Sequence, residues 1–425
     1  MVRKNIQRIE QKYLKIFCAI TIALFFIGAF SLASPRELIV GMKELIIARD
    51  TLITDYFKLV GYGTAFFNSA VMMSIVLGFI HFLEIPFTGL SVAVFFISAG
   101  FALFGKNPVN SLPILLGTYL YARQQGVSYK RYVYTGLFGT CLAPLVTEMV
   151  YILPFGQIGN LIGAALIGMM IGFVLPALAM HTASMHMGYC LFNVGFAAGI
   201  VGFIIICVLK GFGIHSETAM IWQEGLPKEG LILLYGYFIL TFLLGVWVNK
   251  GKIKPALKIV RHPGRAVADF VLMDGVGSTM INMAVVGSLC LTYIVLIGGD
   301  LSGPVVGGIL SIFGFAAFGV HPKNYLPCML GVYLGTVIKI YEPTMPAIQL
   351  AALFSAGIAP IAGQFGVLPG ILAGILHTSI VTCTSALYAG LNLYNNGFAA
   401  GFVAIFMVPL LESFIKKYNQ GSSRR

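Results

Sequence analysis

Long apolar stretches separated by short polar segments run along nearly the whole chain. A helix needs about 20 apolar residues to cross the roughly 30 Å hydrocarbon core of a bilayer, so most of these stretches predict transmembrane helices. Those within 88–123 and 303–340 are shorter and interrupted, which predicts broken or re-entrant helices and leaves the count open by about two per half. The pattern predicts helices near residues 14–34, 59–83, 88–104, 109–123, 132–152, 158–180, 195–213, 231–249, 273–297, 303–318, 323–340, 348–366, 368–382 and 396–413.

The two halves of the chain are related in sequence. Residues 100–120, GFALFGKNPVNSLPILLGTYL, and residues 314–334, GFAAFGVHPKNYLPCMLGVYL, are identical at 13 of 21 positions, at an offset of 214 residues. Later in each half, NVGFAAG at 193–199 matches NNGFAAG at 395–401. Matches of this length indicate a duplication. We therefore divide the chain into a first copy, residues 1–229, and a second copy, residues 230–425.

Charged residues in the loops predict that the two copies are inverted. Lys and Arg beside apolar segments mark cytoplasmic loops, and three pairs of equivalent loops carry opposite charge signatures. The sequence thus predicts an all-α polytopic protein of the cell membrane, with about 14 transmembrane segments as two inverted seven-helix repeats and both termini in the cytoplasm. The cytoplasmic set is Arg3, Lys4, Arg8, Lys12, Lys15, Arg123, Lys130, Arg131, Lys250, Lys252, Lys254, Lys258, Arg261, Arg265, Lys416, Lys417, Arg424 and Arg425.

The composition supports a lipid environment. Of the 425 residues, 58% are hydrophobic and only 10% are charged, whereas soluble globular proteins carry about 25% charged residues. The net charge of +12 lies in loops beside apolar segments, so we expect it to set topology and expect no nucleic-acid partner. The seven cysteines include no CxxC pair, and neither an HExxH nor a GxSxG motif is present, so we expect no metal, no cofactor and no enzymatic activity.

Three pairs of polar breaks occur where the chain should lie in hydrocarbon. Backbone that leaves a helix there must line a cavity or be wrapped in protein, because lipid offers no hydrogen bonds. The breaks are therefore candidate parts of a substrate path. Each pair has an alternative interpretation: close helix packing by glycine for the first, a tight surface hairpin for the second and structural histidines for the third. The candidates are Thr64, Asn68, Ser278 and Asn282 in the first pair, Asn107, Asn110, His321 and Asn324 in the second, and, within 182–195 and 384–397, Ser184, His186, Asn193, Thr384, Asn395 and Asn396 in the third.

A lone carboxyl group, Glu148, lies in an otherwise apolar segment, and Gln364 is its counterpart in the second copy. Placing an acid inside a membrane is energetically unfavourable, so such a residue is a functional hypothesis in its own right. Glu148 is a candidate carrier of a coupling proton or cation. The alternative is that it lies near the outer end of its helix and is hydrated.

The FGKNPVNSLPILLGTYL and FNVGFAAG stretches resemble an uncharacterised prokaryotic family of multi-spanning membrane proteins, known only as a domain of unknown function. The resemblance covers nearly the whole chain and implies a multi-spanning fold, but no substrate. A fainter likeness is to urea transporters, whose halves are also inverted and which carry asparagine-glycine and proline-rich leucine motifs. The chain has more predicted crossings than the urea-transporter core and no clear equivalent of its pore signature.

The sequence therefore predicts a membrane transporter that moves a small polar solute or ion through a site between two inverted repeats, with ion coupling through Glu148. The alternative is a channel for a small neutral solute, favoured by the symmetric asparagines and the scarcity of buried charge. A membrane scaffold or enzyme is a third, less favoured class. The expected partners are the lipid bilayer and the solute or ion, and a homo-oligomer is compatible with the sequence.

Overall fold

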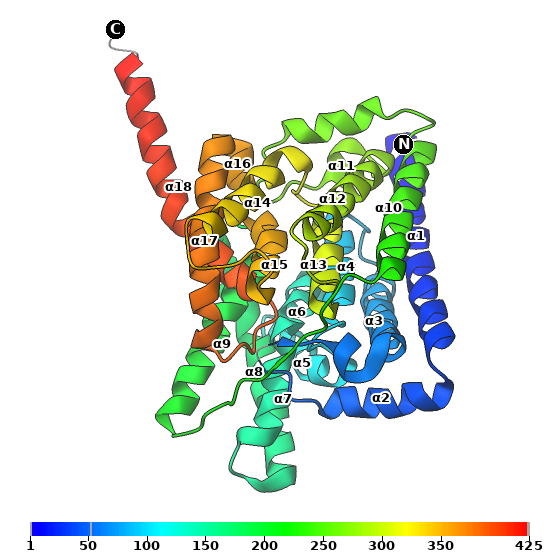
Figure 1. The fold of residues 1–425 in the computed structure, drawn as a ribbon, viewed down its shortest axis with the longest axis vertical. Helices are drawn as coiled ribbons and strands as arrows, with labels where there is room; N and C mark the ends of the chain where they lie inside the picture. Colours follow the sequence, from blue (N-terminus) through cyan, green and yellow to red (C-terminus); the bar gives the residue numbers. More distant parts are fainter. Residues whose placement is uncertain (1, 52, 423–425) are drawn as a thin grey trace.

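The computed structural model describes residues 2–51 and 53–422, which fold almost entirely into α-helices (Figure 1). Within this part of the chain, ten segments are long and apolar enough to cross a membrane, which agrees with the predicted all-α, multi-spanning class. Arg424 and Arg425, used above to assign the C-terminus, lie outside the described residues. The ten segments are α1 (Val2–Leu32), α3 (Tyr56–Phe82), α6 with α7 (Val133–Gly139 and Ala143–Ile152), α8 (Gly156–Met185), α9 (Asn193–Gly211), α10 (Lys228–Val248), α12 (Val276–Leu296), α15 with α16 (Pro346–Phe354 and Ala359–Phe365), α17 (Val367–Leu387) and α18 (Asn395–Ser422).

Four shorter helices lie in the regions predicted to be interrupted. α4 (Gly89–Phe101) and α13 (Gly303–Phe315) have 13 residues each, and α5 (Pro108–Gln124) and α14 (Pro322–Val337) have 17 and 16. All are shorter than the roughly 20 residues that a membrane span needs. Every residue of α13 is buried, as is every residue of α4 except the half-buried Leu90, so these two helices form the centre of the bundle.

Two predicted helices, 132–152 and 348–366, are each divided by a 3₁₀ turn. The turns are η2 (Thr140–Leu142) and η4 (Ser355–Ile358), and α7 and α16 begin directly after them with a proline near the start. Proline has no N–H to donate to the preceding turn, which explains the break. Glycine makes a second kind of break, because Gly61 and Gly275 have φ of 78° and 85° at equivalent places in the two copies.

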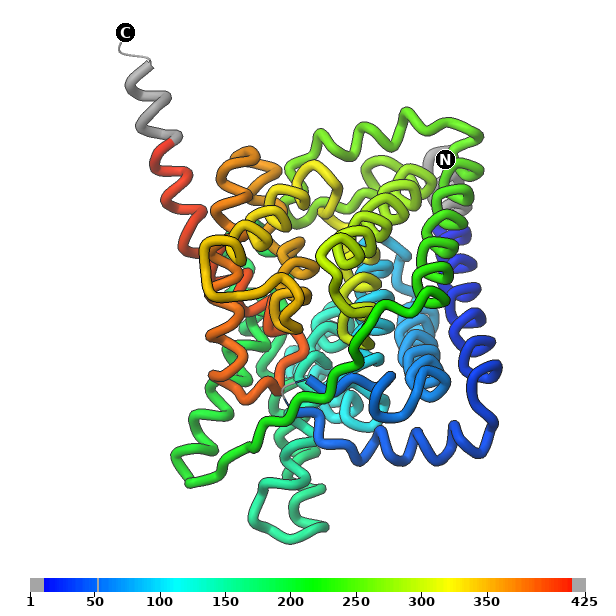
Figure 2. The backbone as a smooth tube through the Cα atoms, in the orientation of Figure 1, coloured from blue at the N-terminus to red at the C-terminus, as the bar shows by residue number. Residues whose placement is uncertain are grey.

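The remaining elements lie at the ends of the bundle. α2 (Pro35–Ile47) begins with a capping box between Ser34 and Glu37 and lies across the lower end in Figure 1, whereas the lysine-rich η3 (Lys254–Arg261) lies near the upper end. An extended segment after α9 leads to α10 (Figure 2). Within it, β2 (Met220–Ile221) pairs in parallel with β1 (Ile53–Thr54). The other short elements are η1 (Tyr129–Arg131) and α11 (Phe270–Asp274).

Equivalent helices of the two copies pack against each other in antiparallel fashion. Thr21 of α1 shares a 2.8 Å hydrogen bond with Tyr237 of α10, and Tyr13, earlier in α1, lies against Trp247, later in α10. α1 therefore runs down, and α10 runs up, in Figure 1. At the centre, α4 and α13 also pack against each other, with Gly100 of α4 against the backbone of Gly307.

Two aspartates connect the copies reciprocally. Asp55 accepts a hydrogen bond of 3.0 Å from the backbone N–H of Gly303, at the start of α13. Asp269, its equivalent, accepts from the N–H of Gly89, at the start of α4, with both oxygens within 3.0 Å. Each copy thus supplies the carboxylate that satisfies the first N–H groups of the other copy's central helix.

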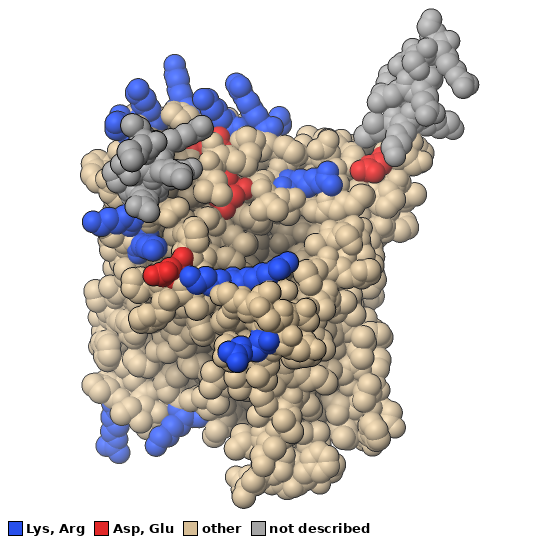
Figure 3. Space-filling view, turned by 180° about the vertical axis from the view of Figure 1, so that it is seen from behind, with Lys and Arg blue, Asp and Glu red and all other residues tan. Residues whose placement is uncertain are grey.

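Charged side chains gather at one end of the molecule. Lys and Arg are concentrated at the end that carries η3 (Figure 3), where Lys250, Lys252, Lys254, Lys258 and Arg261 are all exposed. α1 begins at the same end (Figure 1). We call it the η3 end, and the opposite end the α2 end.

Candidate substrate site between the two copies

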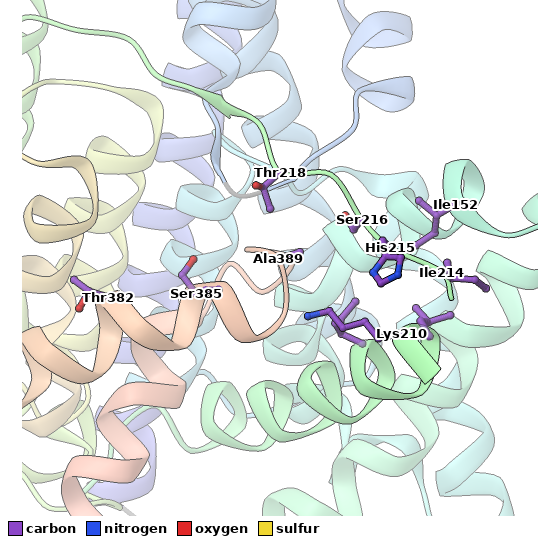
Figure 4. Close-up of a pocket in the computed structure, with 12 residues that line it drawn as sticks. Ile152, Lys210, Ile214, His215, Ser216, Thr218, Thr382, Ser385 and Ala389 are labelled. Atoms are coloured by element: carbon purple, nitrogen blue, oxygen red, sulfur yellow. The ribbon is translucent and has the colours of Figure 1, made fainter. Parts of the chain in front are cut away.

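Two cavities lie between the copies, each of about 370 Å³. The first, which we call the lysine cavity, is lined by α7, α9 and the segment after α9 on one side and by α17 on the other (Figure 4). The second, the asparagine cavity, is lined by Ile53 and Phe104 of the first copy and by α15, α17 and the start of α18 of the second. Thr382 and Ser385 of α17 line both cavities, so the two adjoin.

Half of the twelve residues that line the lysine cavity are polar or charged. Lys210, in the last turn of α9, and His215, four residues after its end, lie on one side, with Thr382 and Ser385 of α17 on the other (Figure 4). Lys210 makes no ion pair with any described residue, and no carboxylate side chain lines the cavity. The lining therefore presents a free cation together with hydroxyl groups.

The asparagine cavity has a different chemistry, since most of its lining side chains are apolar and none is charged. Its polar side includes Asn392, Asn395 and Asn396. Asn396 faces His377 across a 3.1 Å hydrogen bond. Asn392 is only 2% exposed, and its amide nitrogen has no hydrogen-bond partner among the described residues. A buried donor without a partner is rare in proteins and marks a place where a ligand or a water molecule can accept a hydrogen bond.

At the η3 end, the turn equivalent to the one that borders the cavities is covered by residues of the second copy. The turn at Met187 and Gly188 has the same backbone form as the turn at Ala389 and Gly390, with φ of 51° and 80° against 53° and 71°. Ala389 and Gly390 line the cavities. Gly188, in contrast, accepts a 2.9 Å hydrogen bond from the N–H of Ala266.

We call residues 262–267, which make this closure, the strap. The Arg265 side chain donates to the carbonyl of Met187 and lies over the ring of Tyr189, 4.6 Å from its centroid. This contact combines a charge-assisted hydrogen bond with a cation–π interaction. The strap therefore contacts the turn at Met187 and Gly188, whereas the equivalent Ala389 and Gly390 border the cavities.

Glu148 contacts Ser216, one of the residues that line the lysine cavity. Its carboxylate accepts hydrogen bonds of 2.6 and 3.1 Å from Arg49 and one of 2.7 Å from the hydroxyl of Ser216, which lines the cavity. The side chain is fully buried, so it is not the hydrated surface residue of the alternative interpretation. Gln364 is exposed on α16, and its side chain forms no hydrogen bond with the part of the chain that the structure describes. The coupling role of Glu148 stays a prediction.

The sequence matches one protein family, described as "Protein of unknown function (DUF1576)", over residues 34–211 and 248–413. The chain belongs to this family. Both matched segments begin at equivalent positions of the two copies, since 34 and 248 differ by the repeat offset of 214. No curated protein and no solved structure matches the chain, so the expected likeness to urea transporters is not supported.

In this DUF1576 member, the first predicted pair of polar breaks lies away from both cavities. The amide of Asn68 donates to the carbonyls of Ala102 and Lys106, at 2.7 and 2.8 Å. Asn282 makes the same two bonds to the equivalent residues of the second copy, both at 2.8 Å. Thr64 lies against Gly41, and Ser278 accepts from Asn249. These side chains satisfy backbone groups between α4 and α5 or between α13 and α14, or hold neighbouring helices together.

The second pair forms helix caps. Asn107 and Asn110 make a reciprocal capping box at the start of α5, and His321 and Asn324 do the same for α14. The amides of Asn110 and Asn324 also reach back to the carbonyls of Gly105 and Gly319, at 3.1 and 2.9 Å. The break between the short helices is therefore wrapped in protein rather than open to a cavity.

The third pair is the one that reaches a cavity. Asn395 and Asn396 line the asparagine cavity, and Ser385, within the same predicted run, lines both. Asn395 itself accepts from Thr384 and Tyr388. In the first copy, the equivalent Asn193 accepts from Thr182 at 2.7 Å and lies 2.9 Å from His186, on the closed side. Ser184 is exposed and bonds only to its own helix.

The sequence did not point to Lys210, His215, Thr382 or Asn392 as site residues. Lys210 looked like an ordinary loop charge, and no periodic pattern marks the others. The cluster of asparagines at 392–396 is a signal that could have included Asn392.

Proposed function

We propose that the protein is a transporter for a small polar solute or ion, in which two inverted repeats expose a shared site alternately to the two sides of the membrane. The observation that carries the proposal is the difference between equivalent places: the cavities border Ala389 and Gly390, while the strap closes the corresponding turn at Met187 and Gly188. An open channel is continuous from one side of the membrane to the other, whereas a transporter is closed at one end at a time.

The antiparallel pairing of equivalent helices supports inversion of the copies. It holds for α1 with α10 through Thr21 and Tyr237, and for the central α4 with α13. The reciprocal caps of Asp55 and Asp269 fit a two-fold relation between the copies. With the four short helices α4, α5, α13 and α14 counted as segments beside the ten longer ones, each copy would have seven. An odd number is what inversion requires.

The charge distribution supports a direction. Because positive loops face the cytoplasm, we assign the η3 end, with its exposed Lys and Arg residues, to the inside of the cell membrane. The strap is then the inner gate, and the cavities are reached from the outside. Breaking the Arg265 contacts should shift the equilibrium toward the inward-open state, by about tenfold for each 1.4 kcal/mol removed.

Cysteine labelling tests this. In a background without the exposed Cys207 and Cys383, Ser385→Cys reports on the open cavities and Leu191→Cys on the closed side. A membrane-impermeant maleimide is applied to whole cells and to inside-out vesicles. We expect Arg265→Ala to slow outside labelling at position 385 and to speed inside labelling at position 191, each several-fold. Lys258→Ala removes a charge from the same end without touching the gate and should change neither rate.

The result separates the candidate mechanisms. If Arg265→Ala speeds labelling at position 191 but leaves position 385 equally reactive, the two ends open independently and the protein behaves as a channel. If Arg265→Ala has no more effect than Lys258→Ala, the strap is not a gate.

A further inference from the structure

We propose that the two adjoining cavities bind one small amphipathic anion, with its anionic group in the lysine cavity and its apolar part in the asparagine cavity. The inference rests on the proposed function only in naming this molecule as the transported solute. Binding itself follows from the lining residues and can be tested separately.

The lysine cavity selects for negative charge. Lys210 and His215 line it together with the hydroxyls of Thr218 and Ser385, and no carboxylate does. The buried acid nearest to it, Glu148, is already neutralised by Arg49. Glu217, next to Ser216 in the chain, is exposed and does not line the cavity. The Ser216 and Thr382 hydroxyls donate to Glu148 and to the carbonyls of α17, which leaves those of Thr218 and Ser385 beside Lys210. An unpaired cation beside two hydroxyl donors favours an anion such as a carboxylate or a phosphate ester.

The asparagine cavity selects for an apolar part. Phe104, Leu350 and Phe354 line it, with Met220 and Met345 among its other apolar residues, and it contains no charge. A second charged group there would lose its hydration without gaining a partner. Contact of the two cavities at Thr382 and Ser385 allows one ligand to extend from one into the other.

The cavity volume limits the ligand. About 370 Å³ for each cavity lies near the lower end of the 300–1,000 Å³ typical of small-molecule sites. This suits a soluble single-chain anion rather than a two-chain phospholipid.

Thermal unfolding of the full chain in neutral phosphatidylcholine nanodiscs provides the test, because a bound ligand raises the midpoint. The probes are hexanoate, its uncharged analogue hexanamide, and acetate, which lacks the apolar part. We expect hexanoate to bind about tenfold or more tightly than either, since a charge-assisted hydrogen bond and buried methylenes are each lost in one analogue.

Variants assign the two halves of the site. Lys210→Gln should remove the preference for hexanoate over hexanamide, while the exposed Lys228→Gln, outside both cavities, should leave it intact. Met345→Ser should weaken hexanoate several-fold without changing acetate; Met345 is 43% exposed, so folding should tolerate it.

Several outcomes would overturn the inference. Equal binding of hexanoate and hexanamide, or an unchanged preference in Lys210→Gln, would remove the role of charge. Equal stabilisation by chloride would show a general salt effect. Loss of hexanoate binding in phosphatidylglycerol nanodiscs would identify a lipid headgroup site instead. If hexanoate binds as expected but the cysteine reporters do not respond reciprocally, the proposal of alternating access is wrong and this binding site stands. If the reporters respond reciprocally but hexanoate does not bind, only the binding site is wrong.

Discussion

A close approach between the copies, where α4 packs against α13, gives a sharp test of the fold. A Cβ atom added at Gly100 would lie 2.2 Å from the carbonyl oxygen of Gly307 and 2.8 Å from its carbonyl carbon. Since carbon makes ordinary contacts at about 3.5 Å, the added atom would be roughly 1.3 Å too close to that oxygen. The obstacle is backbone on a fully buried helix, so side-chain rotation cannot relieve it. The two helices would have to separate, which in a packed core destabilises by about 1–3 kcal/mol.

Gly100→Ala should therefore lower the thermal unfolding midpoint of purified protein in detergent by several degrees. Gly236 of α10 offers a matched control, because an added Cβ there meets nothing within 4 Å. Gly236→Ala should be neutral or slightly stabilising, since alanine favours the helix by up to about 1 kcal/mol. Equal midpoints for the two variants would mean that α4 and α13 do not cross as closely as described.

Three further changes probe other contacts. Asp269→Ala leaves the buried N–H of Gly89 without an acceptor and should lower the free energy of unfolding by about 1–3 kcal/mol, whereas Glu342→Ala, an exposed acid, should have no effect in the same unfolding assay. Burial raises the pKa of Asp50, which lies between α2 and α3, to about 8. The folded state thus holds a proton that the unfolded state releases near pH 4, so this residue should cost the folded state about 1.4 kcal/mol per pH unit as the pH rises from about 4 to 8. Asp50→Asn should flatten the fall of the unfolding midpoint over that range; an unchanged slope would contradict the assignment. If Glu148 carries a coupling proton, Glu148→Gln in proteoliposomes should abolish solute accumulation driven by a proton gradient but retain exchange, and undiminished accumulation would exclude the role.

The positions of the helices could be predicted from sequence because lipid imposes a simple rule. Continuous apolar stretches mark helices whatever they pack against, and most predicted segments agree with the observed helices to within about five residues. The exceptions are α1, which begins well before the predicted residue 14, α18, which continues past the predicted residue 413, α2, which was not predicted, and the two helices in which Pro144 and Pro360 follow a 3₁₀ turn. The short helices within 88–123 and 303–340 were also visible as interruptions. The start of α2 carries the S-x-x-E signature of a capping box at Ser34 and Glu37, a signal that the apolar pattern alone does not use.

The candidate site was harder to predict, because polarity in a membrane segment has two uses. Asn68 and Asn282 look like substrate ligands in the sequence, yet their amides are occupied by backbone carbonyls. Lys210 looks like a topology signal, yet it lines a cavity. Which of these uses applies depends on the partner, and the partners of Asn68 and Glu148 lie 34 and 99 residues away in the chain. The third polar run was useful since Asn395 and Asn396 lie where the two copies meet.

The reciprocal caps have a consequence for biosynthesis. When the first copy has been synthesised, Asp55 still lacks its partner Gly303 and the N–H of Gly89 still lacks its acceptor Asp269. Both partners follow more than 150 residues later in the chain. Until then the N–H at the start of α4 has no acceptor, and Asp55 accepts hydrogen bonds only from Phe57 and Gln223 of its own copy. A chain that stops before α11 should therefore be recognised by quality-control proteases. Supplied as two separate polypeptides, the halves should instead rescue each other when they are inserted together.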